Sequence, residues 1–162
     1  MQHAARYHIS GFAQQNPAYA KKMSEKLEEI LQTFQDNWAE LEKALREFIN
    51  RLKEGDVGEF PGLDPWIEVP FVRLMLETVS KNTVCDQARE QRLIDLTLDL
   101  IEHIRQEIRR VGFWKSEQRR STLINHLARR LIVDAGLLPP MARDLAYQLV
   151  ALAKHNHEAL TQ

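Results

Sequence analysis

Apolar side chains recur every three or four positions between Tyr19 and Leu52, and this stripe constrains the fold more than any other feature. Spacings of three and four keep side chains on one side of an α-helix, whereas a half-buried strand needs strict alternation. The pattern predicts a helical arm over about residues 17–53, which as one helix would be about 55 Å long at about 1.5 Å per residue. The stripe consists of Tyr19, Met23, Leu27, Ile30, Phe34, Trp38, Leu41, Leu45, Phe48 and Leu52.

The middle of this arm holds its least helical residues, Asp36 and Asn37. Their side chains compete with the backbone for hydrogen bonds and favour helix ends over helix interiors. A break at this point would give two shorter antiparallel helices, whereas an unbroken pattern of this length suits a coiled coil. The arm is expected to begin at Asn16 and Pro17, which have the chemistry of an N-cap and of a first helical position.

The rest of the chain alternates helical patterns with glycine- and proline-rich breaks. Residues 54–66 hold three glycines and two prolines and are expected to form a loop. A short helix over about residues 2–13 precedes the arm, and C-terminal helices are expected over about residues 67–157. The sequence therefore predicts an all-α fold. We expect an irregular bundle of about six helices, one or two of them long and antiparallel, in a single helical domain over residues 1–162.

Composition narrows the class of protein further. The chain has 162 residues, a formal net charge of -1, 44% hydrophobic residues and 28% charged residues, which is ordinary for a globular domain. The near-zero net charge gives no overall attraction to nucleic acid or to an anionic membrane. The N-terminus lacks the apolar stretch of a signal peptide, and no segment reaches the roughly 18 apolar residues of a membrane span. We therefore expect a cytoplasmic protein with no membrane partner.

The sequence contains no motif for catalysis or cofactor binding. It lacks a phosphate-binding P-loop, a dinucleotide-binding glycine motif and a Gly-x-Ser-x-Gly nucleophile motif. The pairs His3/His8 and His155/His157 do not have the spacing of three or four that metal ligands on one helix face need, so we expect surface histidines. The single cysteine, Cys85, is expected to be a small buried or half-buried apolar side chain. We predict no catalytic residue, metal or cofactor in this chain.

One stretch of the chain is unusually basic. Residues 102–130 hold eight Lys and Arg against three acidic residues, whereas residues 25–47 hold seven acidic and three basic residues. One interpretation is that the basic and acidic stretches attract and neutralise each other within the domain. The other is that the basic stretch contacts phosphate or an acidic protein, because the planar guanidinium of arginine binds both bidentately. Phe113 and Trp114, at the joint, are either core residues or an exposed anchor for a partner. The candidate contact residues are Arg105, Arg109, Arg110, Phe113, Trp114, Lys115, Arg119, Arg120, Arg129 and Arg130.

Several segments of the chain, taken in order, carry a family resemblance. They are Ala5-Arg6-Tyr7-His8-Ile9, Asn16-Pro17-Ala18-Tyr19, Lys22 to Leu31, Trp38, Leu100 to Ile108, and Phe113-Trp114 with the arginine-rich helix after it. Together they resemble the C-terminal helical region of the R subunits of type I restriction-modification enzymes, and they cover nearly the whole chain. One departure is Gly112, where the family is expected to have an acidic residue.

The resemblance implies an assembly role. R subunits are ATP-dependent DNA translocases and endonucleases, and their C-terminal helical region attaches them to a methyltransferase core of modification and specificity subunits. The implied partners are that core and the subunit's own motor and nuclease domains, with DNA as a further contact within the complex. ATP and Mg²⁺ are implied only for the motor and nuclease domains. Because Ala5 to Ile9 resembles the interior of a longer protein, we expect a part of such a protein or a separately encoded piece, and no enzyme by itself.

The residues leave two other functions open. The basic patch from Arg105 to Arg130 would also suit direct nucleic-acid binding. In that case each neutralised phosphate adds about -0.9 to the slope of log affinity against log salt on duplex DNA. The stripe over residues 19–52 would suit a self-associating coiled-coil scaffold.

Overall fold

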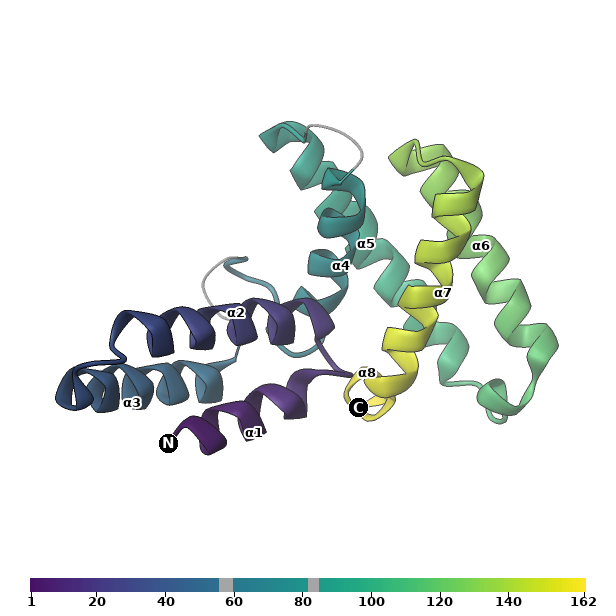
Figure 1. The fold of residues 1–162 in the computed structure, drawn as a ribbon. Helices are drawn as coiled ribbons and strands as arrows, with labels where there is room; N and C mark the ends of the chain where they lie inside the picture. Colours follow the sequence, from purple (N-terminus) through teal and green to yellow (C-terminus); the bar gives the residue numbers. More distant parts are fainter. Residues whose placement is uncertain (56–59, 82–84) are drawn as a thin grey trace. The chain divides into compact units, whose positions relative to one another are not determined.

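The computed structural model describes residues 1–55, 60–81 and 85–162, so the predicted loop over 54–66 falls partly outside the described residues. The described residues form α-helices and turns, with one short 3₁₀ turn and no strand (Figure 1), which confirms the predicted all-α fold. The helices are α1 (Gln2–Phe12), α2 (Pro17–Thr33), α3 (Trp38–Glu54), α4 (Val69–Ser80), α5 (Gln87–Ile108), α6 (Glu117–Ala135), α7 (Pro139–His155) and α8 (His157–Thr161), with the 3₁₀ turn η1 (Phe113–Lys115) between α5 and α6. None of these described helices has both the length and the apolar character that crossing a membrane requires.

The chain divides into two compact units, Met1–Pro70 and Phe71–Gln162. The first unit contains α1, α2 and α3, and the second contains α5 to α8 with most of α4. Each unit buries apolar side chains of its own helices. The single domain over residues 1–162 stays a prediction.

The predicted arm consists of two helices, α2 and α3, which run antiparallel and side by side (Figure 1). The break lies between Thr33 and Trp38, at the weak point formed by Asp36 and Asn37. The Asn37 side chain accepts a hydrogen bond from the backbone N–H of Glu40 at 3.3 Å. This contact satisfies one of the backbone donors that a helix start leaves unpaired. Of the two arrangements that the sequence leaves open, the structure has the pair of shorter helices.

The helix α1 packs against both α2 and α3 and completes the core of the first unit. The apolar stripe supplies most of this core, with one clear exception: Trp38 is 81% exposed. The Tyr19 hydroxyl donates a hydrogen bond to the Gly55 carbonyl at 3.1 Å and joins the start of α2 to the end of α3. The buried residues of this core are Ala5, Ile9, Tyr19, Ala20, Leu27, Leu41, Leu45, Phe48 and Leu52.

In the second unit, the ends of α6 and α7 follow the signals that the sequence provides. The Ser116 hydroxyl accepts a hydrogen bond from the backbone N–H of Arg119 at 3.3 Å and caps the start of α6. Gly136 ends α6 with a left-handed φ of 68°, and Pro139 occupies the first turn of α7. Helices α6 and α7 then pack side by side in opposite directions (Figure 1). The basic stretch of residues 102–130 runs from α5 through η1 into α6.

Candidate docking site

The eight Lys and Arg residues of the stretch 102–130 form the basic cluster, and they lie on either side of the sharp turn between α5 and α6. Gly112 permits this turn, because its φ of 75° lies in a left-handed region that residues with a side chain rarely adopt. Two arginines of α6 then fix the turn. Arg119 Nη1 donates to the Val111 carbonyl at 2.9 Å, and Arg120 Nη1 donates to the Trp114 carbonyl at 2.6 Å. These two candidate contact residues therefore brace the turn.

Phe113 and Trp114 have different surroundings. Phe113 is 1% exposed and belongs to the core, whereas Trp114 is half-buried. Their rings meet edge to face, with centroids 5.0 Å apart. The Trp114 indole N–H donates to Nδ1 of His157 at 3.2 Å, so a neutral His157 carries its own proton on Nε2. Of the two roles that the sequence leaves open, Phe113 takes the core role, and Trp114 lies at the edge of the core.

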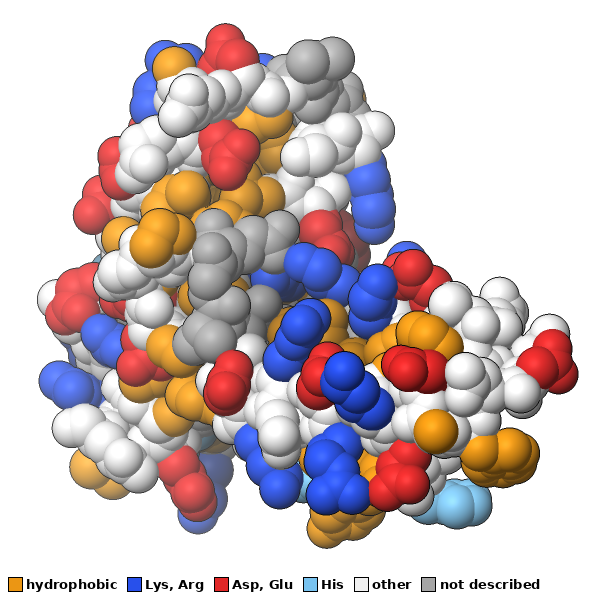
Figure 2. Space-filling view, turned by 90° about the vertical axis from the view of Figure 1, so that its left-hand side faces the viewer, with side chains coloured by type: hydrophobic (Ala, Val, Ile, Leu, Met, Phe, Trp, Pro, Cys, Tyr) orange, Lys and Arg blue, Asp and Glu red, His pale blue; other side chains and the backbone are white. Residues whose placement is uncertain are grey.

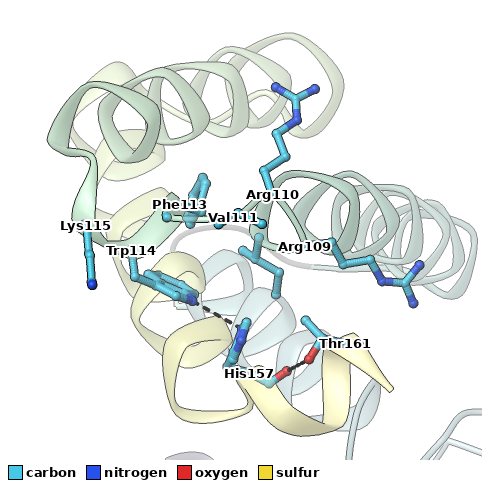
Figure 3. Close-up of a pocket in the computed structure, with 10 residues that line it drawn as sticks. Arg109, Arg110, Val111, Phe113, Trp114, Lys115, His157 and Thr161 are labelled. Atoms are coloured by element: carbon cyan, nitrogen blue, oxygen red, sulfur yellow. Dashed lines mark hydrogen bonds between the residues drawn. The ribbon is translucent and has the colours of Figure 1, made fainter.

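A hollow of about 440 Å³ lies between the end of α5, η1 and α8 (Figure 3). Figure 3 shows Val111 and Trp114 beside this hollow, while the side chains of Arg109, Arg110 and Lys115 extend outward from its edge. Val111 is 96% exposed. The hollow therefore combines apolar surface with a rim of three cations.

The structure separates the ten candidate contact residues into three groups. Five line the hollow, namely Arg109, Arg110, Phe113, Trp114 and Lys115. Two brace the turn, namely Arg119 and Arg120. The remaining three, which lie on α5 and α6 outside the lining of the hollow, are Arg105, Arg129 and Arg130.

Ion pairs neutralise only part of the basic cluster. Exposed pairs of this kind contribute about 0–1 kcal/mol each, so their cations can exchange partners at little cost. Arg109, Lys115 and Arg129 have no carboxylate partner within the part of the chain that the structure describes. The pairs of the cluster are Arg105–Glu102 (3.8 Å), Arg110–Glu107 (3.0 Å) and Arg130–Asp99 (3.8 Å), and Arg130 also contacts Asp134.

The acid-rich stretch over residues 25–47 forms ion pairs within its own unit. Their side chains are about half exposed or more, which is typical of a solvated helix face. The molecular face shown in Figure 2 likewise carries interspersed acidic and basic side chains. That this acidic stretch neutralises the basic stretch of residues 102–130 within the domain stays a prediction. The pairs are Lys26–Glu29 (2.7 Å), Arg46–Glu42 (3.0 Å) and Arg6–Glu28 (2.7 Å).

The rings of two histidines, one on α5 and one on α6, lie in contact, and this pair is not predicted from the sequence. The rings of His103 and His126 lie with centroids 4.1 Å apart and planes tilted by 31°. Burial lowers the pKa of His126, and the neighbouring His103, Arg130 and Arg129 lower it further, against an opposing effect of Glu107. Each histidine immediately precedes a buried residue of its helix, and this position beside the apolar stripe is the signal that could have located the pair.

The other residues considered for chemistry differ in their exposure. His157 differs from the expected surface histidine, because it is half-buried against Trp114 at the hollow. His155, two positions earlier, is exposed. Cys85 is a half-buried free thiol, as expected. Across residues 1–55, 60–81 and 85–162, no three His, Cys, Asp or Glu side chains form a group that could hold a metal ion.

The chain matches no protein-family model, no curated protein and no solved structure. The indications of its function are therefore the site itself and the resemblance of its segments. Cations around an apolar hollow on a braced turn are suited to binding another macromolecule.

Proposed function

We propose that this chain is a non-catalytic docking module that attaches the R subunit of a type I restriction endonuclease to its methyltransferase core. In this role it holds the ATP-dependent translocase and nuclease domains against the modification and specificity subunits during DNA restriction. The resemblance of the segments between Ala5 and Trp114 supports the identity of the partners. The geometry of the turn between α5 and α6 supports the docking role.

The observation that carries the docking role is the braced basic turn. Binding surfaces favour Trp and Arg, with apolar side chains at the centre and charged ones at the rim. Half-buried Trp114 and exposed Val111, with cations around them, follow this arrangement. Because Arg119 and Arg120 fix the backbone of the turn, little conformational entropy is lost when a partner binds.

Assembly measurements test the proposal. The purified chain of residues 1–162 is titrated into the complex of modification and specificity subunits, and association is followed by analytical ultracentrifugation. We expect a complex to form, and we expect an R subunit that lacks these residues to keep its ATPase activity but lose assembly. A chain that does not bind the core, together with a truncated R subunit that still assembles, would contradict the proposal.

Nucleic-acid binding is the second candidate function, and the unpaired cations Arg109, Lys115 and Arg129 favour it. Binding of a 20-base-pair duplex by the isolated chain would then weaken steeply with salt, by about -0.9 in the log–log slope for each phosphate neutralised. A slope near zero, or no binding at low salt, rules this candidate out. Self-association through the stripe over residues 19–52 stays a prediction, and sedimentation of the same sample tests it.

A further inference from the structure

We infer that the hollow between α5, η1 and α8 binds an acidic segment of a protein partner, one apolar side chain of which contacts Val111 and Trp114. This contact presupposes the proposed docking function and adds to it the place of the interaction and the chemistry of the partner. Four properties of the hollow support it: its charge, its apolar surface, its rigidity and the packing of its tryptophan.

The charge of the hollow selects an acidic occupant. Its described lining contains Arg109, Arg110 and Lys115 and no carboxylate. Glu107 compensates Arg110 from outside the lining at 3.0 Å, so Arg109 and Lys115 hold the uncompensated charge. An approaching segment that carries Asp or Glu is attracted to these two cations, whereas a basic segment is repelled.

The apolar part of the hollow requires an apolar side chain beside those carboxylates. Val111 is 96% exposed, and a single exposed valine needs no explanation. This valine, however, adjoins half-buried Trp114 and the 3% exposed Ile108 in one hollow. Partner side chains that fill such hollows inside a charged rim supply much of the binding energy of protein interfaces.

Internal hydrogen bonds fix the walls of the hollow. Arg119 and Arg120 hold the carbonyls of Val111 and Trp114, and the Trp114 indole is bonded to His157 (Figure 3). Because the backbone of Val111 and the ring of Trp114 are already held in place, a partner that contacts them loses less conformational entropy than one that must order them.

The packing of Trp114 favours a protein over a nucleic acid. Single-stranded nucleic acids bind to aromatic rings that are open for stacking. The Trp114 ring instead meets Phe113 and His157 edge to face, with centroids 5.0 and 5.9 Å away, and its N–H is already bonded. A duplex needs several phosphate contacts for affinity, and the hollow offers only the uncompensated Arg109 and Lys115 among its described lining residues.

Carbodiimide coupling tests the chemistry of the partner, because it joins a lysine amine to a carboxylate in contact with it. The assembled R, modification and specificity subunits are treated, and the linked peptides are identified by mass spectrometry. We expect Lys115 to be linked to an Asp or Glu of the modification or specificity subunit. Lys115→Arg keeps the charge and removes the reactive amine, so the link should disappear. Lys154, an exposed lysine of α7, is the control and should form no such link.

Charge reversal tests the contribution of the hollow to affinity. The double variant Arg109→Glu/Lys115→Glu should bind the core at least about tenfold more weakly, as expected when rim charges lose their partners. The matched control Arg143→Glu/Lys154→Glu changes the net charge equally at exposed positions of α7 outside the hollow and should stay within about twofold. Val111→Asp should weaken binding in the same way as the first pair. Circular dichroism of all three variants separates lost binding from lost folding.

The outcomes distinguish this contact from the docking function itself. If the unchanged chain does not bind the core, the docking function fails and the contact with it. If the core binds the chain and the Arg109→Glu/Lys115→Glu variant equally well and no Lys115 link forms, only the contact at the hollow is wrong. If the same double variant abolishes binding of a 20-base-pair duplex and leaves core binding intact, the hollow is a nucleic-acid site and the inference is overturned.

Discussion

Trp114 and His157 lie 43 positions apart in the sequence, and a single hydrogen bond of 3.2 Å joins them. Trp114→Phe keeps an aromatic ring but leaves Nδ1 of His157 without its donor. We expect the free energy of unfolding in urea to fall by about 0.5–1.5 kcal/mol. Trp38→Phe is the control: Trp38 is 81% exposed, so its replacement should change stability by less than about 0.5 kcal/mol. Equal losses in the two variants would contradict this account.

We expect His126 to make stability depend on pH in one direction. The pKa of His126 lies below its ordinary value of 6.5, through burial first and through His103 and two arginines second. The unfolded chain therefore binds the proton more readily, and the free energy of unfolding falls as the pH drops below about 6.5. The slope is a fraction of the roughly 1.4 kcal/mol per pH unit that one full proton would give.

Substitution of His126 should remove this pH dependence. We expect the loss of stability between pH 7.5 and pH 5.5 to be smaller in His126→Gln than in the unchanged chain, as measured by urea unfolding at both pH values. His155→Gln, at an exposed position of α7, should keep the full loss. If both variants retain the same pH dependence as the unchanged chain, His126 is not its source.

At the scale of the elements, two glycines should respond to alanine in opposite directions. Gly112 has a φ of 75°, and a Cβ added there would meet nothing within 4 Å, so Gly112→Ala is strained by the backbone alone. We expect a loss of about 1–2 kcal/mol in the free energy of unfolding. Gly11 lies inside α1, and a Cβ there also meets nothing within 4 Å, so Gly11→Ala should gain about 0.5–1 kcal/mol. Thermal unfolding measures both, and a loss at Gly11 would show that space around α1 is restricted.

Several helix ends could be predicted because local signals determine them. Asn16, Asn37 and Ser116 each accept a hydrogen bond from the backbone N–H three residues on, as short polar side chains do at helix starts. Gly136 takes the left-handed conformation that ends α6. Trp38 belongs to the predicted apolar stripe but is exposed, because it is the first residue of α3 and few side chains cover it there.

The candidate site could be predicted only in part. The sequence places a basic stretch around Phe113 and Trp114, and the structure puts a hollow there. The sequence does not indicate that Arg119 and Arg120 donate hydrogen bonds to backbone carbonyls, because these bonds depend on the path of the turn, which tertiary packing determines. For the same reason, the sequence does not indicate the contact of His157 with Trp114, because the two residues are far apart in the chain and only the fold places them together.

At the scale of the whole molecule, the division into two units bears on how the chain unfolds. Leu52 in the first unit and Leu127 in the second are both fully buried, each within its own unit. Truncation of a buried leucine to alanine costs about 2–5 kcal/mol. Because the contacts of the chain cluster within each unit, this cost should fall mainly on the unit that holds the leucine.

Hydrogen exchange followed by mass spectrometry checks this expectation by location. Leu52→Ala should raise the exchange rates of amides in α1, α2 and α3 and leave those of α5 to α8 within about twofold of the unchanged chain. Leu127→Ala serves as the reciprocal control and should do the opposite. A rise in exchange throughout the chain for either variant would mean that one cooperative domain spans residues 1–162. In such a domain, a change in stability at the turn between α5 and α6 would also affect the helical arm of α2 and α3. Separable units would instead let the arm and the turn bind different partners independently.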